Sequence, residues 1–240
     1  MAIETMSTET IEAEPLLYQY RRFFANQYLH GDGIEVGALN HPLALPETAR
    51  IKYVDRLSVA DLRRHYPELA DEPLVEVDII DNGEHLQTVE EASQDFVIAN
   101  HFIEHCQDPI TTIENLLRVL KKGGILYLAV PDKRYSFDSD RPITSFEHLL
   151  KDYQEGPENS KVSHYQEWAE LVLKETDKSQ VQDIVKKLIK RDYSIHFHVW
   201  ESRNFLDFLV SLKNHLNFPL EVQRLFQNSS EFITILTKSR

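Results

Sequence analysis

Short apolar runs alternate with amphipathic helical stretches over the first half of the sequence. The runs are strand-sized and recur at similar intervals, at residues 33–37, 51–55, 74–78, 95–99 and 125–130. Helix-like stretches such as 59–66 and 109–120 lie between them. Strands joined through helices form right-handed crossovers and lie parallel to one another. The alternation therefore predicts an α/β domain with a mainly parallel sheet.

The segments at the two ends extend this core. Residues 15–30 carry apolar side chains at helical spacing after a proline, which predicts a helix that caps the sheet. Two apolar runs, 220–227 and 231–237, are joined by an Asn-Ser-Ser turn, so these strands must be antiparallel. We therefore divide the chain into a tail with a capping helix, 1–30, and one domain, 31–240.

A long segment, 132–193, interrupts the alternation. It is polar, rich in tyrosine and too long for a simple connection in a compact sheet. Helical spacing recurs at 143–153 and 162–190. We therefore expect a helical lid inserted at 132–193.

The composition excludes several kinds of partner. The 39 acidic residues exceed the 26 basic ones and give a net charge of −13, so the average surface repels nucleic-acid phosphates. A single cysteine is typical of a reducing compartment. Residues 1–15 lack the features of a signal peptide and are expected to form a frayed tail, and no apolar run has the roughly 20 residues of a membrane helix. We expect a cytoplasmic protein that binds neither nucleic acid nor membrane.

Polar residues and one glycine stand at or just after the carboxyl ends of four predicted strands. They are, in chain order, Glu35, Gly37, Asp55, Asp78, Asn100 and His101. Ligands of an open parallel sheet bind outside these strand ends, where the strand order reverses. A single aspartate there is usually a turn or helix cap. The acidic residues Glu35, Asp55 and Asp78, however, are separated by about one βα unit each. This regular spacing favours a site for a bound ligand over three unrelated caps.

The motifs GIEVGALN, YVD, EVDI and ANHFIEH, which contain these residues, resemble those of class I S-adenosylmethionine-dependent methyltransferases, in particular the type 11 group. The resemblance covers residues 31–131 and, more loosely, 195–238. It implies a Rossmann-like α/β fold whose mainly parallel seven-stranded sheet has an antiparallel C-terminal strand and a helical insertion. It also implies that S-adenosylmethionine is the cofactor.

The resemblance assigns a part of the cofactor to each strand end. It implies that Glu35 and Gly37 hold the methionine end and that Asp55 accepts hydrogen bonds from the ribose. It places Asp78 at the adenine amino group, with Ile79 beside the ring. The loop that begins with Asn100 and His101 would face the cofactor.

The sequence departs from this group after Gly37. Further glycines are usual there, whereas Ala38, Leu39, Asn40 and His41 follow in this chain. A nicotinamide enzyme needs glycines spaced for a pyrophosphate at a helix N-terminus, so the departure argues against that class. It leaves a second interpretation open, a catalytically silent methyltransferase-like domain that serves as a binding or scaffold module.

Three histidines are candidates for a general base. Methyl transfer to a hydroxyl group needs a proton acceptor, and neutral imidazole suits that role near neutral pH. His196 and His198 would share one face of a strand near the expected acceptor entrance, and His101 is the reserve candidate. A core role is an equal alternative for the first two. His105 adds a further possible metal ligand, but the resemblance accounts for its segment without a metal, so we expect no metal site.

The expected reaction is O-methylation of a small-molecule or sugar-like acceptor. The lid would supply acceptor specificity through its aromatic side chains, Tyr135, Phe137, Tyr153, Tyr165 and Trp168. The sequence makes no prediction about the oligomeric state.

Overall fold

The computed structural model describes residues 15–239, so the tail expected over 1–15 lies, apart from Pro15, outside the described residues. Within them one sheet has the strand order β3-β2-β1-β4-β5-β7-β6. Its strands are β1 (Gly31–Val36), β2 (Ala49–Asp55), β3 (Ile79–Ile80), β4 (Gln94–Asn100), β5 (Leu120–Pro131), β6 (Leu220–Asn228) and β7 (Glu231–Lys238). Strands β1 to β5 are parallel, and β7 is antiparallel to both of its neighbours. The predicted mainly parallel seven-stranded sheet with an antiparallel C-terminal strand is confirmed.

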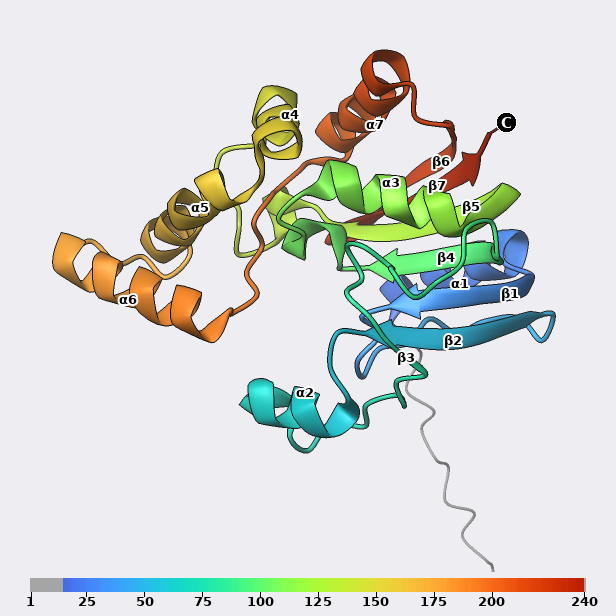
Figure 1. Ribbon diagram of the computed structural model, residues 1–240, viewed down its shortest axis with the longest axis horizontal. Helices are drawn as coiled ribbons and strands as arrows, with labels where there is room; N and C mark the ends of the chain where they lie inside the picture. Colours follow the sequence, from blue (N-terminus) through green and yellow to red (C-terminus); the bar gives the residue numbers. More distant parts are fainter. Residues whose placement is uncertain (1–14, 240) are drawn as a thin grey trace, which may run out of the picture.

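Helices cover both faces of the sheet (Figure 1). They are α1 (Leu16–Tyr28), α2 (Val59–His65), α3 (Pro109–Val119), α4 (Phe146–Glu155), α5 (Glu158–Leu171), α6 (Lys178–Arg191) and α7 (Ser202–Leu216). Three short 3-10 helices are η1 (Pro67–Leu69), η2 (Ile103–His105) and η3 (Lys133–Tyr135). No helix in 15–239 is long and apolar enough to cross a membrane.

Alternate residues of the central strands face the two helical layers. In β4, Phe96 and Ile98 pack in one apolar cluster with Phe24 of α1. Val97 and Ala99 pack in the other cluster, with residues of α3 and α7. Side chains on a strand alternate between its faces, so a strand covered on both sides is apolar throughout. This burial on both faces explains the unbroken apolar run at 96–99.

The lid has three helices, where the sequence pattern indicates two. The stretch expected as one helix over 162–190 is divided between α5 and α6, because Lys174 has a left-handed φ of 59° and Asp177 caps the start of α6. Asp177 accepts hydrogen bonds from the backbone amides of Ser179 and Gln180. The lid helices α5 and α6 extend away from the sheet (Figure 1) and have an apolar core of their own.

The third strand is displaced from its predicted position. Residues 74–78 form no strand, and β3 begins at Ile79. The amide of Val75 donates to the carbonyl of Leu39 instead of to β2. The Asp78 carboxylate accepts a hydrogen bond of 2.8 Å from the amide of Tyr53 in β2. This side-chain contact occupies the Tyr53 amide at a position before β3 begins. Asp78 therefore precedes the third strand instead of ending it.

Candidate functional site

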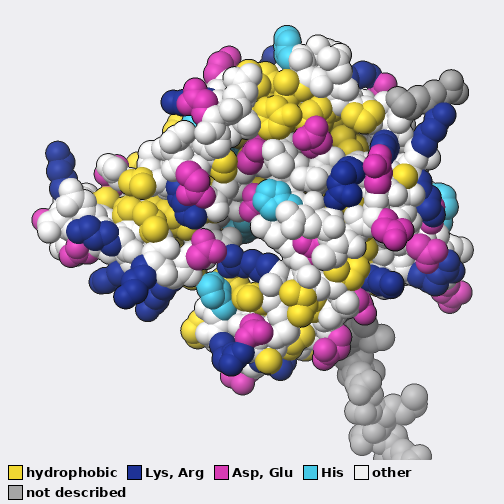
Figure 2. All heavy atoms as spheres, in the orientation of Figure 1, with side chains coloured by type: hydrophobic (Ala, Val, Ile, Leu, Met, Phe, Trp, Pro, Cys, Tyr) yellow, Lys and Arg dark blue, Asp and Glu magenta, His cyan; other side chains and the backbone are white. Residues whose placement is uncertain are grey.

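Two neighbouring cavities open at the carboxyl ends of β1 and β4, where the strand order reverses. The first, here the α1 cavity, has a volume of ≈ 360 Å³ and is lined from α1 by Leu17, Tyr18 and Arg21. The second, here the β2 cavity, has a volume of ≈ 370 Å³ and lies between the end of β2 and the end of the lid. Figure 2 shows the surface hollowed between the lid and the α2 region. The two cavities share four residues, Gly37, Leu39, His101 and His105.

Gly37 turns the chain away from β1 at the boundary of the two cavities. Its φ is +66°, in the left-handed region, and its amide donates to the carbonyl of Val54 at 3.0 Å. An added Cβ would meet only a Phe102 side-chain atom, at the ordinary distance of 3.6 Å. The turn therefore requires glycine for its backbone conformation and not for space.

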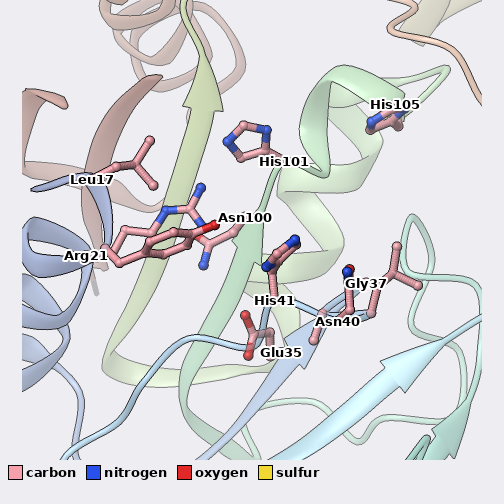
Figure 3. Close-up of a pocket in the computed structure, with 12 residues that line it drawn as sticks. Leu17, Arg21, Glu35, Gly37, Asn40, His41, Asn100, His101 and His105 are labelled. Atoms are coloured by element: carbon pink, nitrogen blue, oxygen red, sulfur yellow. The ribbon is translucent and has the colours of Figure 1, made fainter. Parts of the chain in front are cut away.

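Glu35 projects from β1 toward the α1 cavity (Figure 3). Both of its carboxylate oxygens lie close to the Leu43 amide, at 3.2 and 3.1 Å. Burial raises the pKa of Glu35 to about 7, against the opposing effects of the Leu43 amide, Arg21 and Asn100. The side-chain amide of Asn100 is buried near the Glu35 carboxyl. The geometry between the two groups is not that of a hydrogen bond, so the amide nitrogen and oxygen of Asn100 have no partner within the described chain.

The Glu35 carboxyl predicts a pH dependence of stability. Its folded-state pKa lies above the ordinary value of 4.5, so its stabilising effect is full below about pH 4.5 and is lost as the pH rises to about 7. Relative to Glu35→Gln, the free energy of unfolding of the wild type should fall by on the order of 3 kcal/mol between pH 4.5 and 8. Urea unfolding of both proteins across this range tests the prediction. Parallel pH profiles would contradict it.

The aspartates assigned to the cofactor lie in different places. Asp55 lines the β2 cavity, where burial raises the pKa of its carboxyl. Asp78 and Ile79 line neither cavity. Asp81 follows β3, but its carboxylate accepts hydrogen bonds from the amide and hydroxyl of Thr88. The next three residues, Asn82, Gly83 and Glu84, line the β2 cavity instead.

His101 lies at the junction of the two cavities, directly after β4 (Figure 3). Its side chain is 43% exposed, and its φ of 48° is left-handed, a strained conformation for a residue other than glycine. Its Nε2 lies 2.7 Å from a carboxylate oxygen of Glu231. Its Nδ1 lies 3.8 Å from Glu104 Oε1. The cavities thus expose an imidazole that is held by an acidic partner.

Glu231, at the start of β7, joins three parts of the fold. It is fully buried and accepts hydrogen bonds from both Nε and Nη2 of Arg21 on α1. It also accepts a hydrogen bond from Asn228. Burial favours a higher pKa for Glu231, but hydrogen bonds with Arg21 and His101 hold it at about 2. Glu231 is therefore ionised at neutral pH.

Glu104 is a second acidic group beneath His101. Its carboxylate is 2% exposed, and neither oxygen has a hydrogen-bond partner among the described residues. Burial raises the pKa of Glu104 to about 7, although His196 opposes the rise. Glu104, Glu231 and Arg21 are not among the site residues predicted from the sequence. Glu104 lies in the ANHFIEH motif, but no local pattern indicates Glu231 or Arg21.

The other two candidate histidines lie outside both cavities. His196 is 8% exposed, and its Nδ1 lies 2.6 Å from Asp138 Oδ2. His198 is fully buried against α4 and α5 of the lid, beside His148 and His164. The segment 195–200 has no strand pairing except one bridge at its end. The structure therefore brings Glu35, Gly37, Asp55, Asn100 and His101 together, and it does not bring Asp78, Ile79, His196 or His198 to them.

Comparisons with known proteins place the chain in a family. Residues 14–175 match the family described as "Methyltransferase domain". No curated protein matches the sequence. Similar solved structures include a candidate Zn-dependent alcohol dehydrogenase from Rhodobacter sphaeroides, at 14% identity and a TM-score of 0.54 over 91% of this chain and 88% of that one.

Two further solved structures are similar. One is a chain in the complex of the Haloferax volcanii Trm112 methyltransferase activator with a candidate methyltransferase, at 13% identity and a TM-score of 0.50 over 93% of this chain and 90% of that one. The other is an S-adenosylmethionine-dependent methyltransferase from Thermotoga maritima, at 14% identity and a TM-score of 0.45 over 93% of both chains. At these identities a likeness supports the fold alone, whereas the family match covers more than half of the sequence. The chain belongs to the methyltransferase domain family, as a class I methyltransferase whose cofactor is S-adenosylmethionine.

Proposed function

We propose that this protein methylates a hydroxyl group of a small-molecule or sugar-like acceptor, with His101 as the general base. The observation that carries the proposal is the position of His101, whose partly exposed imidazole lies at the junction of the two cavities and contacts the ionised Glu231. S-adenosylmethionine, when bound, supplies a methyl group on a positively charged sulfur. The residues around it have to orient the acceptor, exclude water and take its proton.

The residues of the two cavities fit this cofactor. Asp55 presents a carboxylate to the β2 cavity, and one of its oxygens accepts a hydrogen bond of 3.2 Å from the Leu57 amide. It can therefore accept further hydrogen bonds from ribose hydroxyls. In the α1 cavity, the unpartnered donor and acceptor of Asn100 match the amino and carboxylate groups of a methionine moiety.

The chemistry assigned to His101 follows from its partner. Glu231 is ionised and accepts a hydrogen bond, so Nε2 of His101 carries the proton. The lone pair then lies on Nδ1, which makes no hydrogen bond within residues 15–239 and can take the proton of an acceptor hydroxyl. Glu231 stabilises the positive charge that develops on the ring.

The lid closes one side of the cofactor cavity in this proposal. Tyr193 and Ser194, just after α6, line the β2 cavity. Asp192 forms an ion pair of 2.9 Å with Arg56, which follows β2 and lines the same cavity. Of the lid aromatics, Tyr165 and Trp168 pack in the apolar core of the lid itself. The residues at the end of the lid therefore support a role in cofactor binding better than its aromatic side chains do.

The two aspartates give a matched test of the cofactor site. Asp55→Ala should lower the affinity for S-adenosylmethionine at least about tenfold, because hydrogen bonds to a charged group contribute roughly 1.5–3 kcal/mol each. Asp78→Ala removes the same group from a position outside both cavities and should leave the affinity unchanged. Calorimetric titration of both folded variants measures the difference. A loss confined to Asp78→Ala would place the ribose or adenine elsewhere.

The proposed reaction is tested with S-adenosylmethionine labelled in its methyl group. Sugars, phenols and other alcohols are offered as acceptors, with amines and thiols of similar size for comparison. We expect label on a hydroxyl acceptor. Label on amines alone would refute O-methylation. Cofactor binding without transfer to any acceptor would favour the silent binding or scaffold domain that the side chains after Gly37 leave open.

A further inference from the structure

Three histidines from distant parts of the chain converge on the inner side of the lid. His148 lies on α4, His164 on α5, and His198 in the segment after α6. The two Nε2 atoms of His148 and His164 are 3.1 Å apart. One ring nitrogen from each of the three residues lies within 4.8 Å of the others. Such convergence is the arrangement of a metal site.

Asp152 adds a carboxylate to this cluster. It lies one helical turn after His148, and its Oδ2 is 3.1 Å from His148 Nε2 and 3.8 Å from His164 Nε2. Ser160 donates a hydrogen bond to the other oxygen, Oδ1, which fixes the orientation of the carboxylate. The carboxylate is 1% exposed, so Oδ2 depends on the two imidazoles for its polar contacts.

His198 is held as a ligand would be. Its Nε2 lies 3.3 Å from the backbone carbonyl of Gln107, a contact that requires a proton on Nε2. The lone pair is then on Nδ1, which is buried and has no partner within the described part of the chain. Metal-binding histidines commonly donate their second nitrogen to a carbonyl in this way, which fixes the tautomer and the ring orientation.

Hydrogen bonds alone leave this cluster incomplete. One proton can bridge the Nε2 atoms of His148 and His164, and His148 Nε2 also lies 3.1 Å from Asp152 Oδ2, but Nδ1 of His198 remains buried without a partner in the described chain. Burying such a group unpaired is unfavourable. A cation held by the three imidazoles and the carboxylate would supply the missing partner. The separation of 3.1 Å between the two nitrogens is also close to the about 3.3 Å expected for ligands at tetrahedral zinc.

We propose that His148, His164, His198 and Asp152 bind a divalent transition-metal ion, Zn²⁺ by the nature of their donor atoms. Three imidazole nitrogens and one carboxylate oxygen are ligands that zinc takes in fourfold coordination. A cavity of ≈ 240 Å³ lined by His148 and His164 provides the entry path. This site departs from the expectation of no metal, and it assigns His198 to the metal instead of to catalysis.

The site is structural in this proposal, because four protein ligands leave no open position. It joins α4 and α5 to the segment that contains His198. The amide of His198 in turn donates to the carbonyl of Glu104 at 3.3 Å, in η2 after β4. The metal therefore fixes the lid to the body of the domain. This role does not depend on the identity of the methyl acceptor.

A second group, Glu104, His105 and His196, also has ligand atoms within 4.8 Å of one another. It offers only three ligands, however, one fewer than the four of a closed structural zinc site. His196 Nδ1 also lies 2.6 Å from the Asp138 carboxylate, which already holds that imidazole. The second group is thus the natural comparison in an experiment.

The test is the zinc content of the full chain, measured by elemental analysis after dialysis against metal-free buffer, and zinc titration of chelator-treated protein. We expect one zinc ion per chain and a higher melting temperature with zinc than without it. His164→Ala should weaken zinc binding more than about 100-fold, since losing even an outer partner of a zinc ligand costs about 10–100-fold. His105→Ala, from the second group, and His30→Ala, at an exposed position, should bind zinc as the wild type does.

Each further outcome decides the proposal. If His164→Ala does not fold, the half-buried His148→Ala replaces it, and cobalt substitution reports the geometry, because tetrahedral Co²⁺ absorbs visible light strongly. Loss of that absorption in His148→Ala supports the site. Protein that contains no zinc, binds none on titration and melts at the same temperature with and without it overturns the proposal. So does zinc that is lost in His105→Ala and retained in His148→Ala.

Discussion

His101→Ala is expected to lower kcat for methyl transfer by about 10²–10⁴-fold, the usual contribution of a general base. Affinity for S-adenosylmethionine should change little, because Asp55, Glu35 and Asn100 remain in place. The measurement is kcat on the acceptor identified with labelled cofactor, together with calorimetric titration of the cofactor. Added imidazole should restore part of the activity.

His41→Ala is the matched control, because His41 also lines the α1 cavity but stacks on Tyr18 and has no acidic partner among the described residues. It should retain most of the wild-type kcat. Equal losses in the two variants, without rescue by imidazole, would show that His101 only shapes the cavity. An unchanged kcat in His101→Ala would remove it from the mechanism.

Arg141→Ala is expected to lower the free energy of unfolding by about 3–5 kcal/mol, the effect of breaking a buried ion pair. The Arg141 side chain is 1% exposed and donates to Asp138 and Glu167, both at 2.8 Å. It also donates to the carbonyls of His196 and Phe197. Its removal leaves the Asp138 carboxylate buried with fewer partners and both carbonyls unpaired. Urea unfolding monitored by circular dichroism measures the change.

Arg50→Ala is the control for Arg141. The Arg50 and Asp32 side chains form an ion pair of 2.6 Å but are 74% and 55% exposed, so water replaces the lost interaction. The two variants should therefore differ clearly in stability. If Arg141→Ala were no less stable than Arg50→Ala, the buried polar contacts between the lid and residues 196–197 would contribute nothing to folding.

The central strands were predictable because their signal is local. Phe96 to Ala99 are apolar at every position, and the structure buries them on both faces of the sheet. The positions of Glu35 and Asp55 were predictable for a related reason. Both residues lie at the carboxyl end of a strand, and the place of that strand in the sheet fixes where their side chains lie. The same argument misplaced Asp78, because the hydrogen bond of Val75 to Leu39, which keeps residues 74–77 out of the sheet, leaves no trace in the apolar pattern.

The remaining parts of the site depend on contacts between distant residues. Arg21 and Glu231 are 210 positions apart, and neither lies in a motif that indicates its partner. His196 and His198 alternate around one residue in the sequence, yet they belong to different clusters. Only the positions of α4 and α5 bring His148 and His164 to His198. Such sites require the docking of helices, which a sequence pattern does not specify.

The ion pair between Arg21 and Glu231 also has a consequence for the order of events during synthesis. Arg21 is among the first described residues to leave the ribosome, whereas Glu231 lies eight residues before the last described position. Domains form as units once their sequence is available, and contacts of long sequence separation form slowly. His101 therefore acquires its acidic partner only after β7 has been made. A nascent chain that stops before β7 can contain β1, β2 and β4, yet its His101 imidazole has no Glu231 to hold it.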